Sequence, residues 1–373
     1  MNAAFHVRAL PGRILVVVAL ITATLVGRAG AEVRTGDTRR SAVPSALPKV
    51  RLIATGGTIS NGDGGRLAAE DLVKSIPAVR RFARPEFEQF SNIASGELTL
   101  AQWLQLARRI NRAFAEDGDL AGIVVTSGTD TLEETAYFLN LTVTSPKPVV
   151  VVGSMRGPGT PGYDGAGNLL AGFRVAATPA SRDKGVLVVL NDEINAAREV
   201  AKTDAVRLDT FKSREAGILG VVDSDRVVYY RDPVKRHTSR TEFDVSSIQA
   251  LPRVDVILVY QDAPGDLIKA AVDLGAKGIV MATAGAGAIS GTEAEGLAYA
   301  AQKGVFIVTS TRTGSGRIAR GASTQRLASD RGHRGLSTIA AEDLAPVKAR
   351  ILLMLALTRT TNRDEIQRMF EEY

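Results

Sequence analysis

The chain has 373 residues, 45% hydrophobic and 23% charged, which is the composition of a globular protein large enough for two domains. It contains no cysteine, so disulfides, thiolate catalysis and cysteine metal sites are excluded. The formal charge of +6 is not accompanied by interleaved basic and aromatic residues, which argues against nucleic-acid binding. Histidines occur only at His6, His237 and His333, too few and too scattered for a metal site, and we expect the last two to face solvent.

The first 31 residues have the pattern of a secretory signal peptide. Arg8 and Arg13 precede an apolar run at residues 14–26, and Ala29-Gly30-Ala31 has the small residues of a cleavage site. An apolar run of about 13 residues is too short to span a bilayer, although an uncleaved anchor is the alternative interpretation. We therefore predict cleavage near Ala31, a periplasmic or secreted protein, and no membrane contact after cleavage.

Alternating strand-like and helix-like segments predict an α/β fold in two parts. We expect residues 32–48, which are polar and contain two prolines, to form a disordered lead-in. Residues 49–229 are predicted to be the first α/β domain, which carries the catalytic residues proposed below. Residues 230–251 have the charged composition of a linker, and residues 252–373 are predicted to be a second α/β domain.

Two apolar runs of the first domain, Val149–Val152 and Val186–Leu190, are typical of strands buried on both faces of a parallel sheet. Apolar residues recur on one face of residues 100–115, which predicts an amphipathic helix. In the second domain we predict strands at 255–260, 278–282 and 305–309, and helices at 265–274, 292–303 and 347–357, the last of which closes the fold.

Two short threonine motifs each follow an apolar strand. The sequence TGGTI at residues 55–59 follows a strand at 49–54, and SGTDTLEE at residues 127–134 follows a strand at 121–126. In open α/β sheets the carboxyl edge of the strands is where ligands bind. Two threonines and an aspartate at one edge indicate covalent catalysis by an activated hydroxyl. Within the second motif, Thr131-x-x-Glu134 predicts a capping box for the helix that follows.

These motifs resemble the signatures of bacterial type II L-asparaginases and the related glutaminase-asparaginases. The resemblance rests on both motifs and on the segments at 128–142, 148–156, 202–204, 210–213 and 350–359, and it covers the chain from about Val50 to Tyr373. It implies a larger N-terminal doubly wound domain with a mostly parallel sheet and a smaller C-terminal α/β domain. It also implies a homotetramer, a dimer of dimers with sites between subunits, and no metal or organic cofactor.

The resemblance assigns roles to individual residues. Thr55 is the acyl-accepting nucleophile, and Thr129, Lys202 and Asp130 form a proton relay in which Thr129 activates water for deacylation. Ser95 matches the serine that holds the substrate α-carboxylate. The residues that match further substrate contacts are Gly96, which follows that serine, Asp130 for the α-ammonium, and Ser154, whose backbone carbonyl meets the leaving amide.

Plainer interpretations of the same residues exist. Gly56-Gly57 could be a simple turn or a phosphate cradle, but neither a Gly-Lys-Ser/Thr sequence nor G-x-G-x-x-G spacing follows. Thr129-Asp130 could be only a helix cap, and Lys202 could be a surface lysine. The motifs in their shared order favour the catalytic interpretation.

The chain departs from the family pattern around the substrate amine. Gly96 stands where the family has glutamine or glutamate, with Glu97 one position later. The stretch at 60–67, which corresponds to the family's flexible lid, is short and has no tyrosine. Ala286 stands where a neighbouring subunit normally supplies an asparagine, and the stretch at 311–320 offers arginines instead of a carboxylate. We therefore expect weak recognition of the α-ammonium.

The predicted function is hydrolysis of L-asparagine to L-aspartate and ammonia through a threonine acyl-enzyme. A glutaminase-asparaginase or an amidase with broader small-amide specificity is the alternative within the same class. A periplasmic solute-binding protein, which would also have a signal peptide and two α/β domains, is the alternative from a different class.

Overall fold

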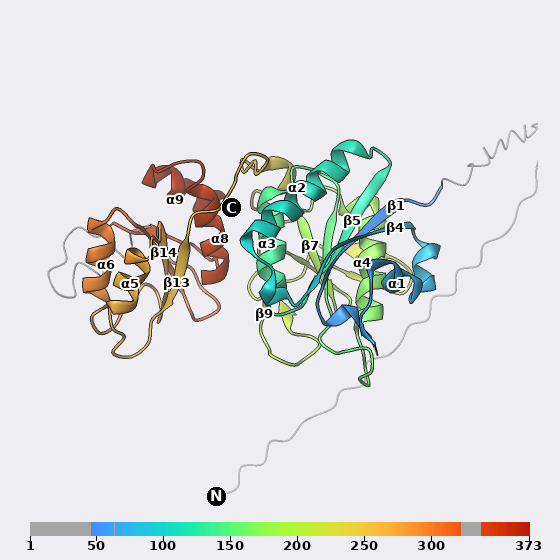
Figure 1. Cartoon of the computed structure of the whole chain (residues 1–373), viewed down its shortest axis with the longest axis horizontal. Coiled ribbons are helices and arrows are strands. Elements are labelled where there is room, and N and C mark those ends of the chain that lie inside the picture. The colour runs from blue at the N-terminus through green and yellow to red at the C-terminus, as the bar shows by residue number, and fades with distance from the viewer. Residues whose placement is uncertain (1–45, 63, 322–336) are drawn as a thin grey trace, which may run out of the picture. The chain divides into compact units, whose positions relative to one another are not determined.

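The computed structural model describes residues 46–62, 64–321 and 337–373 (Figure 1). The predicted signal peptide, most of the predicted lead-in and His333 lie outside the described residues. None of the helices in the described ranges combines the length and apolar character needed to cross a bilayer.

An eight-stranded sheet forms the first part of the fold. Its spatial order is β12-β11-β8-β7-β6-β5-β1-β4. The strands from β4 to β7 pair in parallel, whereas β8, β11 and β12 continue the sheet with antiparallel pairs. The bounds are β1 Lys49–Gly56, β4 Arg84–Ile93, β5 Leu120–Thr126, β6 Val149–Val152, β7 Val186–Leu190, β8 Glu193–Ala196, β11 Gly220–Val222 and β12 Val227–Tyr229.

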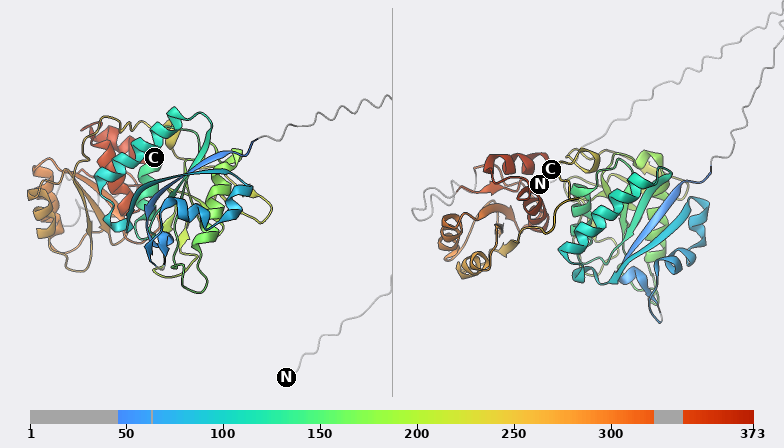
Figure 2. Two further views of the ribbon diagram at one scale, coloured as in Figure 1. Left: turned by 45° about the vertical axis from the view of Figure 1, so that its right-hand side comes forward. Right: turned by 45° about the horizontal axis from the view of Figure 1, so that its top comes forward.

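Helices cover both faces of this sheet (Figures 1 and 2). Alternate strand residues enter different cores: Ile53 and Val125 pack with helices α2 and α3, whereas Leu52 and Val124 pack with α1 and α4. Burial on both faces explains why these strands are continuously apolar. The predicted doubly wound α/β class is confirmed. The helix bounds are α1 Ala69–Lys74, α2 Leu100–Glu116, α3 Leu132–Thr142 and α4 Gly165–Ala177.

Within the residues that the structure describes, two short hairpins and five 3-10 helices complete this part. Both hairpins matter for the site: the β2–β3 hairpin follows the first motif, and the β9–β10 hairpin carries Lys202. Their bounds are β2 Asn61–Gly62, β3 Gly65–Arg66, β9 Ala201–Lys202 and β10 Phe211–Lys212. The 3-10 helices are η1 Thr58–Ser60, η2 Pro77–Arg81, η3 Ser95–Glu97, η4 Pro179–Ser181 and η5 Thr238–Arg240.

A smaller sheet of four parallel strands, in the order β13-β14-β15-β16, forms the second part. Helices α5 and α6 pack on one face, and α8 and α9 pack on the other. The bounds are β13 Val254–Leu258, β14 Gly278–Thr283, β15 Phe306–Thr311, β16 Ile339–Ala340, α5 Asp266–Asp273, α6 Glu293–Gln302, α8 Pro346–Ala356 and α9 Arg363–Glu372.

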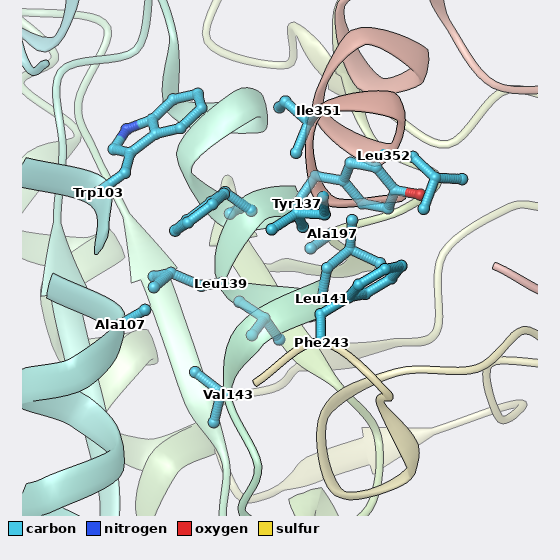
Figure 3. Packing of buried hydrophobic residues seen from close by; sticks show 14 of the residues in the cluster. Trp103, Ala107, Tyr137, Leu139, Leu141, Val143, Ala197, Phe243, Ile351 and Leu352 are labelled. Carbon is cyan, nitrogen blue, oxygen red and sulfur yellow. The ribbon is translucent and has the colours of Figure 1, made fainter. Parts of the chain in front are cut away.

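Helix α8 joins the two sheets through one apolar core. It contacts α3 on one side and strands β13 and β14 on the other. In Figure 3, Ile351 and Leu352 of α8 lie against Tyr137 and Leu141 of α3, and all four side chains are fully buried. Burying such side chains contributes roughly 1.5–3 kcal/mol each, so α8 ties the small sheet firmly to the large one.

Three local predictions were wrong. Thr131 is the N-cap of α3, but its side chain makes no capping hydrogen bond, and Glu134 instead points toward Arg350, with a carboxylate–guanidinium distance of 4.0 Å. The helix at 347–357 does not close the fold, because α9 follows it. His237 is buried, with only 2% of its surface exposed, because its ring packs beside Gly185, where there is no side chain.

Candidate active site

The two threonine motifs lie side by side because their strands are neighbours. Strands β1 and β5 pair in parallel, with Ala54 opposite Thr126, so both motifs begin at the same edge of the sheet. Gly57 has φ 85°, and a Cβ there would lie 2.2 Å from the backbone nitrogen of Gly128. Only glycine permits this approach, which is the physical reason for the paired glycines in the first motif.

Lys202 connects the second motif to the β9–β10 hairpin. Its Nζ donates hydrogen bonds to Thr129 Oγ1 at 3.1 Å and to Asp130 Oδ1 at 2.8 Å. The Lys202 side chain is 16% exposed, whereas that of Asp130 is 84% exposed. Lys202 is thus within hydrogen-bonding distance of both other predicted relay residues, and it is largely buried whereas the Asp130 carboxylate is exposed.

Thr55 lies deeper than the relay. It is 4% exposed, and its Oγ1 donates a 2.6 Å hydrogen bond to the backbone carbonyl of Thr126. Its backbone N–H donates to Thr126 Oγ1 at 3.3 Å. Thr126, which our sequence analysis did not single out, therefore holds Thr55 at two points. Its polar side chain at the end of an otherwise apolar strand is the signal that could have identified it.

A cavity of about 200 Å³ opens beside the relay. It brings together four of the predicted residues, Ser95, Thr129, Asp130 and Lys202, but its lining does not include Thr55, Gly96 or Ser154. The full lining is Gly57, Thr58, Asn61, Arg66, Ala94, Ser95, Gly128, Thr129, Asp130, Met155, Lys202 and Ala205. A larger cavity of about 330 Å³, bordered by β10, β15 and α8, contains none of the predicted site residues.

Ser95 and Gly96 begin the 3-10 helix η3 at the cavity wall. Ser95 is buried, and its Oγ accepts a 3.3 Å hydrogen bond from the backbone N–H of Thr131. Gly96 is exposed, and a Cβ added to it would meet nothing within 4 Å. The Glu97 carboxylate accepts from the backbone N–H of Ala94 at 3.2 Å, so it is engaged in a local turn.

Ser154 is not among the residues that line the cavity, although its neighbour Met155 is. Its hydroxyl donates to the backbone carbonyl of Arg156 at 2.9 Å, and the side chain is buried. The neighbouring Met155 lines the cavity, so the 153–156 loop forms part of the wall.

Two arginines of the stretch at 311–320 are occupied within the chain. Arg317 pairs with Glu342, and Arg320 lies 2.9 Å from Asp364. Arg66, by contrast, lines the cavity, and our sequence analysis did not select it. The available signal was that Arg66 is the only basic residue in the short stretch at 60–67.

A buried ion pair supports Lys202 from the second part of the fold. The backbone N–H of Lys202 donates to Glu133 Oε1 at 3.1 Å, and Glu133 Oε2 lies 3.7 Å from Nζ of Lys348 in α8. Lys348 is 2% exposed and donates to the backbone carbonyls of Ala197 and Arg198, each at 3.0 Å. Burial lowers the pKa of Lys348 to about 8.

No group of three or more metal-ligating side chains occurs in the described part of the chain. The functional groups that line the cavity include hydroxyls, an amine, a carboxylate and a guanidinium. These groups can supply a nucleophile, a proton relay and charged contacts to a small zwitterion.

Comparisons with known proteins identify the family. Residues 49–235 match the model of the asparaginase N-terminal domain, and residues 253–370 match that of the glutaminase/asparaginase C-terminal domain. L-asparaginase 2 of Bacillus subtilis is 45% identical over 338 residues, covering 88% of this chain and 87% of the relative. A probable periplasmic L-asparaginase of Haemophilus influenzae is 38% identical over 337 residues, covering 88% and 93% of the two chains.

A solved structure agrees with the sequence relatives. The crystal structure of a probable cytoplasmic L-asparaginase from Campylobacter jejuni matches with a TM-score of 0.79 and 39% identity, covering 88% of this chain and all of that one. The predicted resemblance is thus confirmed over both parts of the fold, and the chain belongs to the asparaginase family of amidohydrolases.

Proposed function

We propose that this enzyme hydrolyses the side-chain amide of L-asparagine to L-aspartate and ammonia through an acyl-enzyme on Thr55. The observation that carries the proposal is the position of Lys202 Nζ, within hydrogen-bonding distance of both Thr129 Oγ1 and Asp130 Oδ1. A lysine held between a hydroxyl and a carboxylate at a sheet edge has the composition of a proton relay.

In the acylation step, Thr55 Oγ attacks the amide carbon of the substrate. The hydroxyl proton passes to the relay, the carbon–nitrogen bond breaks, and the nitrogen leaves as ammonia with a proton returned by the relay. An amide has a poor leaving group, so this proton transfer to nitrogen is as important as the attack itself. In deacylation, Thr129 and Lys202 take a proton from water, the water oxygen attacks the Thr55 ester, and the relay returns the proton to Thr55 Oγ as L-aspartate leaves.

Substrate binding in this proposal uses both ends of the cavity. Ser95 holds the α-carboxylate, and the Asp130 carboxylate meets the α-ammonium. The backbone carbonyl of Ser154 accepts from the leaving amide. At Gly96 the chain offers no side chain to the ammonium, so the amine end of the substrate is the less tightly held end.

Two alternatives remain within the amidase class. The C-terminal family model is described as that of glutaminases as well as asparaginases, so L-glutamine is the second candidate substrate. Sparse amine contacts would also suit simpler small amides. Membership of an amidohydrolase family argues against the solute-binding alternative.

Ammonia release from L-asparagine, L-glutamine, D-asparagine and simple amides tests the proposal. We expect L-asparagine to give the highest kcat/KM, and mass spectrometry of an acid-quenched reaction to locate an aspartyl adduct on Thr55. Binding of amino acids without ammonia release would contradict the enzymatic assignment, and an adduct on another residue would contradict the role of Thr55.

We further propose that the enzyme is exported and assembles as a homotetramer. Export is supported by the N-terminal sequence pattern and by the periplasmic name of the Haemophilus influenzae relative, although the Campylobacter jejuni relative is described as cytoplasmic. Cell fractionation followed by N-terminal sequencing tests export and cleavage near Ala31. Light scattering of the purified enzyme tests the tetramer.

A further inference from the structure

Arg66 is a charged side chain of the cavity wall for which the proposed mechanism has no use. It belongs to strand β3 of the short hairpin that follows the first motif, and it lines the same cavity as Ser95, Asp130 and Lys202. Guanidinium groups bind carboxylates well because their N–H donors form a planar fork. A cation in this position therefore calls for an anionic group on the ligand.

The partners of Arg66 leave most of its donors available. Its Nη1 donates to the backbone carbonyl of Asn92 at 2.8 Å, and its own backbone carbonyl accepts from Asn92 Nδ2 at 3.5 Å. No carboxylate of the described residues lies within ion-pair distance of its guanidinium. Lys202, the other cation of the cavity, is already bound to Thr129 and Asp130.

The contact with Asn92 places Arg66 at a particular end of the cavity. Asn92 begins the segment that leads through Ile93 and Ala94 into Ser95, so the guanidinium lies on the wall formed by that segment. Asp130, which would repel a carboxylate, is on the side held by Lys202. The carboxylate of Asp130 is thus paired with Lys202, whereas the guanidinium of Arg66 has no carboxylate partner among the described residues and is the cation left for an anionic group of the ligand.

We propose that Arg66 is a specificity-determining residue that binds the carboxylate of the amide substrate together with Ser95. This inference deepens the proposed function and rests on it. It makes the carboxylate of the amide substrate, rather than its amine, the group that the enzyme recognises most strongly.

The test compares wild type with Arg66→Gln on three amides. L-asparagine has both charged groups, succinamate keeps the carboxylate but lacks the amine, and 3-aminopropanamide keeps the amine but lacks the carboxylate. For L-asparagine and succinamate we expect KM to rise by about tenfold or more, with kcat within about twofold. For 3-aminopropanamide we expect no change in kcat/KM, because the group that Arg66 binds is missing.

The control is Arg80→Gln, which changes an exposed arginine of η2 outside the cavity and should leave all three substrates unaffected. Where an analogue turns over too slowly, its inhibition constant against L-asparagine provides the same comparison. An equal loss on all three compounds, or no loss on any, would overturn the assignment of Arg66. If the wild-type enzyme releases ammonia neither from these three amides nor from L-glutamine, the proposed function itself is wrong.

Discussion

Thr55 Oγ1 donates a 2.6 Å hydrogen bond to the backbone carbonyl of Thr126, the last residue of the neighbouring parallel strand. The proposed nucleophile is thus tied to the sheet and lies beside the cavity, not within its lining. Attack on a substrate requires exchange of that hydrogen bond for one to the relay. Because this hydrogen bond joins a neutral hydroxyl to a neutral carbonyl, it stabilises the fold by only about 1 kcal/mol. Exchanging it for a bond to the relay therefore costs little free energy.

Removal of the Thr55 hydroxyl should abolish turnover without unfolding the protein. Thr55→Val nearly preserves side-chain volume, so we expect kcat to fall by about 10³-fold or more, with a stability loss of about 1 kcal/mol. Steady-state ammonia release and urea unfolding measure the two effects. Thr142→Val is the matched control, because Thr142 is also buried and also donates to a backbone carbonyl, at 2.7 Å. A Thr55→Val enzyme within about tenfold of wild-type turnover would refute the nucleophile assignment.

Lys202→Met should remove the base and keep the apolar stem. Thr129 then loses its hydrogen-bonding partner and Asp130 its counter-ion, so we expect activity to fall to background. Lys212→Met, on the paired strand β10, is the control, because Lys212 pairs with Glu193 at 3.1 Å outside this cavity. Normal rates with an unchanged pH profile in Lys202→Met would show that the lysine is a bystander.

Gly96→Gln should restore a contact to the α-ammonium. The position is exposed and a side chain meets nothing within 4 Å of its Cβ, so the substitution can be accommodated. We expect KM for L-asparagine to fall by about tenfold with little change in kcat, as for an interaction made equally in ground and transition states. Gly118→Gln, another exposed glycine with open surroundings, should leave KM unchanged. A wild-type KM already in the micromolar range, with rejection of succinamate, would mean that other residues bind the amine.

Lys348→Met should change the pH dependence of stability. The pKa of Lys348 is about 8 in the folded protein and 10.5 ordinarily, so the unfolded chain binds more protons between these values. Wild-type stability therefore rises with pH through that window, whereas the variant lacks this rise. We expect the free energy of unfolding of the wild type, measured by urea unfolding, to increase relative to that of Lys348→Met by about 2 kcal/mol from pH 7.5 to 9.5. If the difference in free energy of unfolding stays constant or decreases over this range, the lowered pKa of Lys348 is wrong.

His237 should make the fold sensitive to acid. Its Nε2 faces Arg240 at 2.9 Å and its Nδ1 faces Thr238 Oγ1 at 2.9 Å, and burial together with Arg240 lowers its pKa to about 4. Below the ordinary value of 6.5 the unfolded chain takes up a proton that the folded chain resists, so stability falls as pH decreases toward 4. Between pH 7 and pH 5, the free energy of unfolding of the wild type should decrease by about 2 kcal/mol more than that of His237→Gln. Equal losses in both proteins would show that His237 does not titrate in this way.

The local patterns of the sequence were sufficient to predict several strands and helices and the family. Strands β6 and β7 occupy the predicted residues, because a run of valines and leucines buried on both faces has no other stable environment. Helix α2 begins at the predicted residue, because its apolar face repeats with the helical period. The two motifs indicated the shared sheet edge, because each follows a strand directly and parallel neighbours end on the same side.

Only the tertiary structure decided which side chains meet and which are buried. The sequence separation between Lys202 and Thr129 contains no information on distance, and their contact depends on how the β9–β10 hairpin returns to β5. Thr131 lost its predicted capping role and His237 its predicted exposure because packing against distant segments outweighs local preference. Arg66 lines the cavity because the β2–β3 hairpin folds back beside Asn92, a contact between segments that are separated in the sequence. A side chain forms hydrogen bonds with, and is buried by, the groups that lie nearest to it in space. The sequence determines which groups those are only through the complete fold.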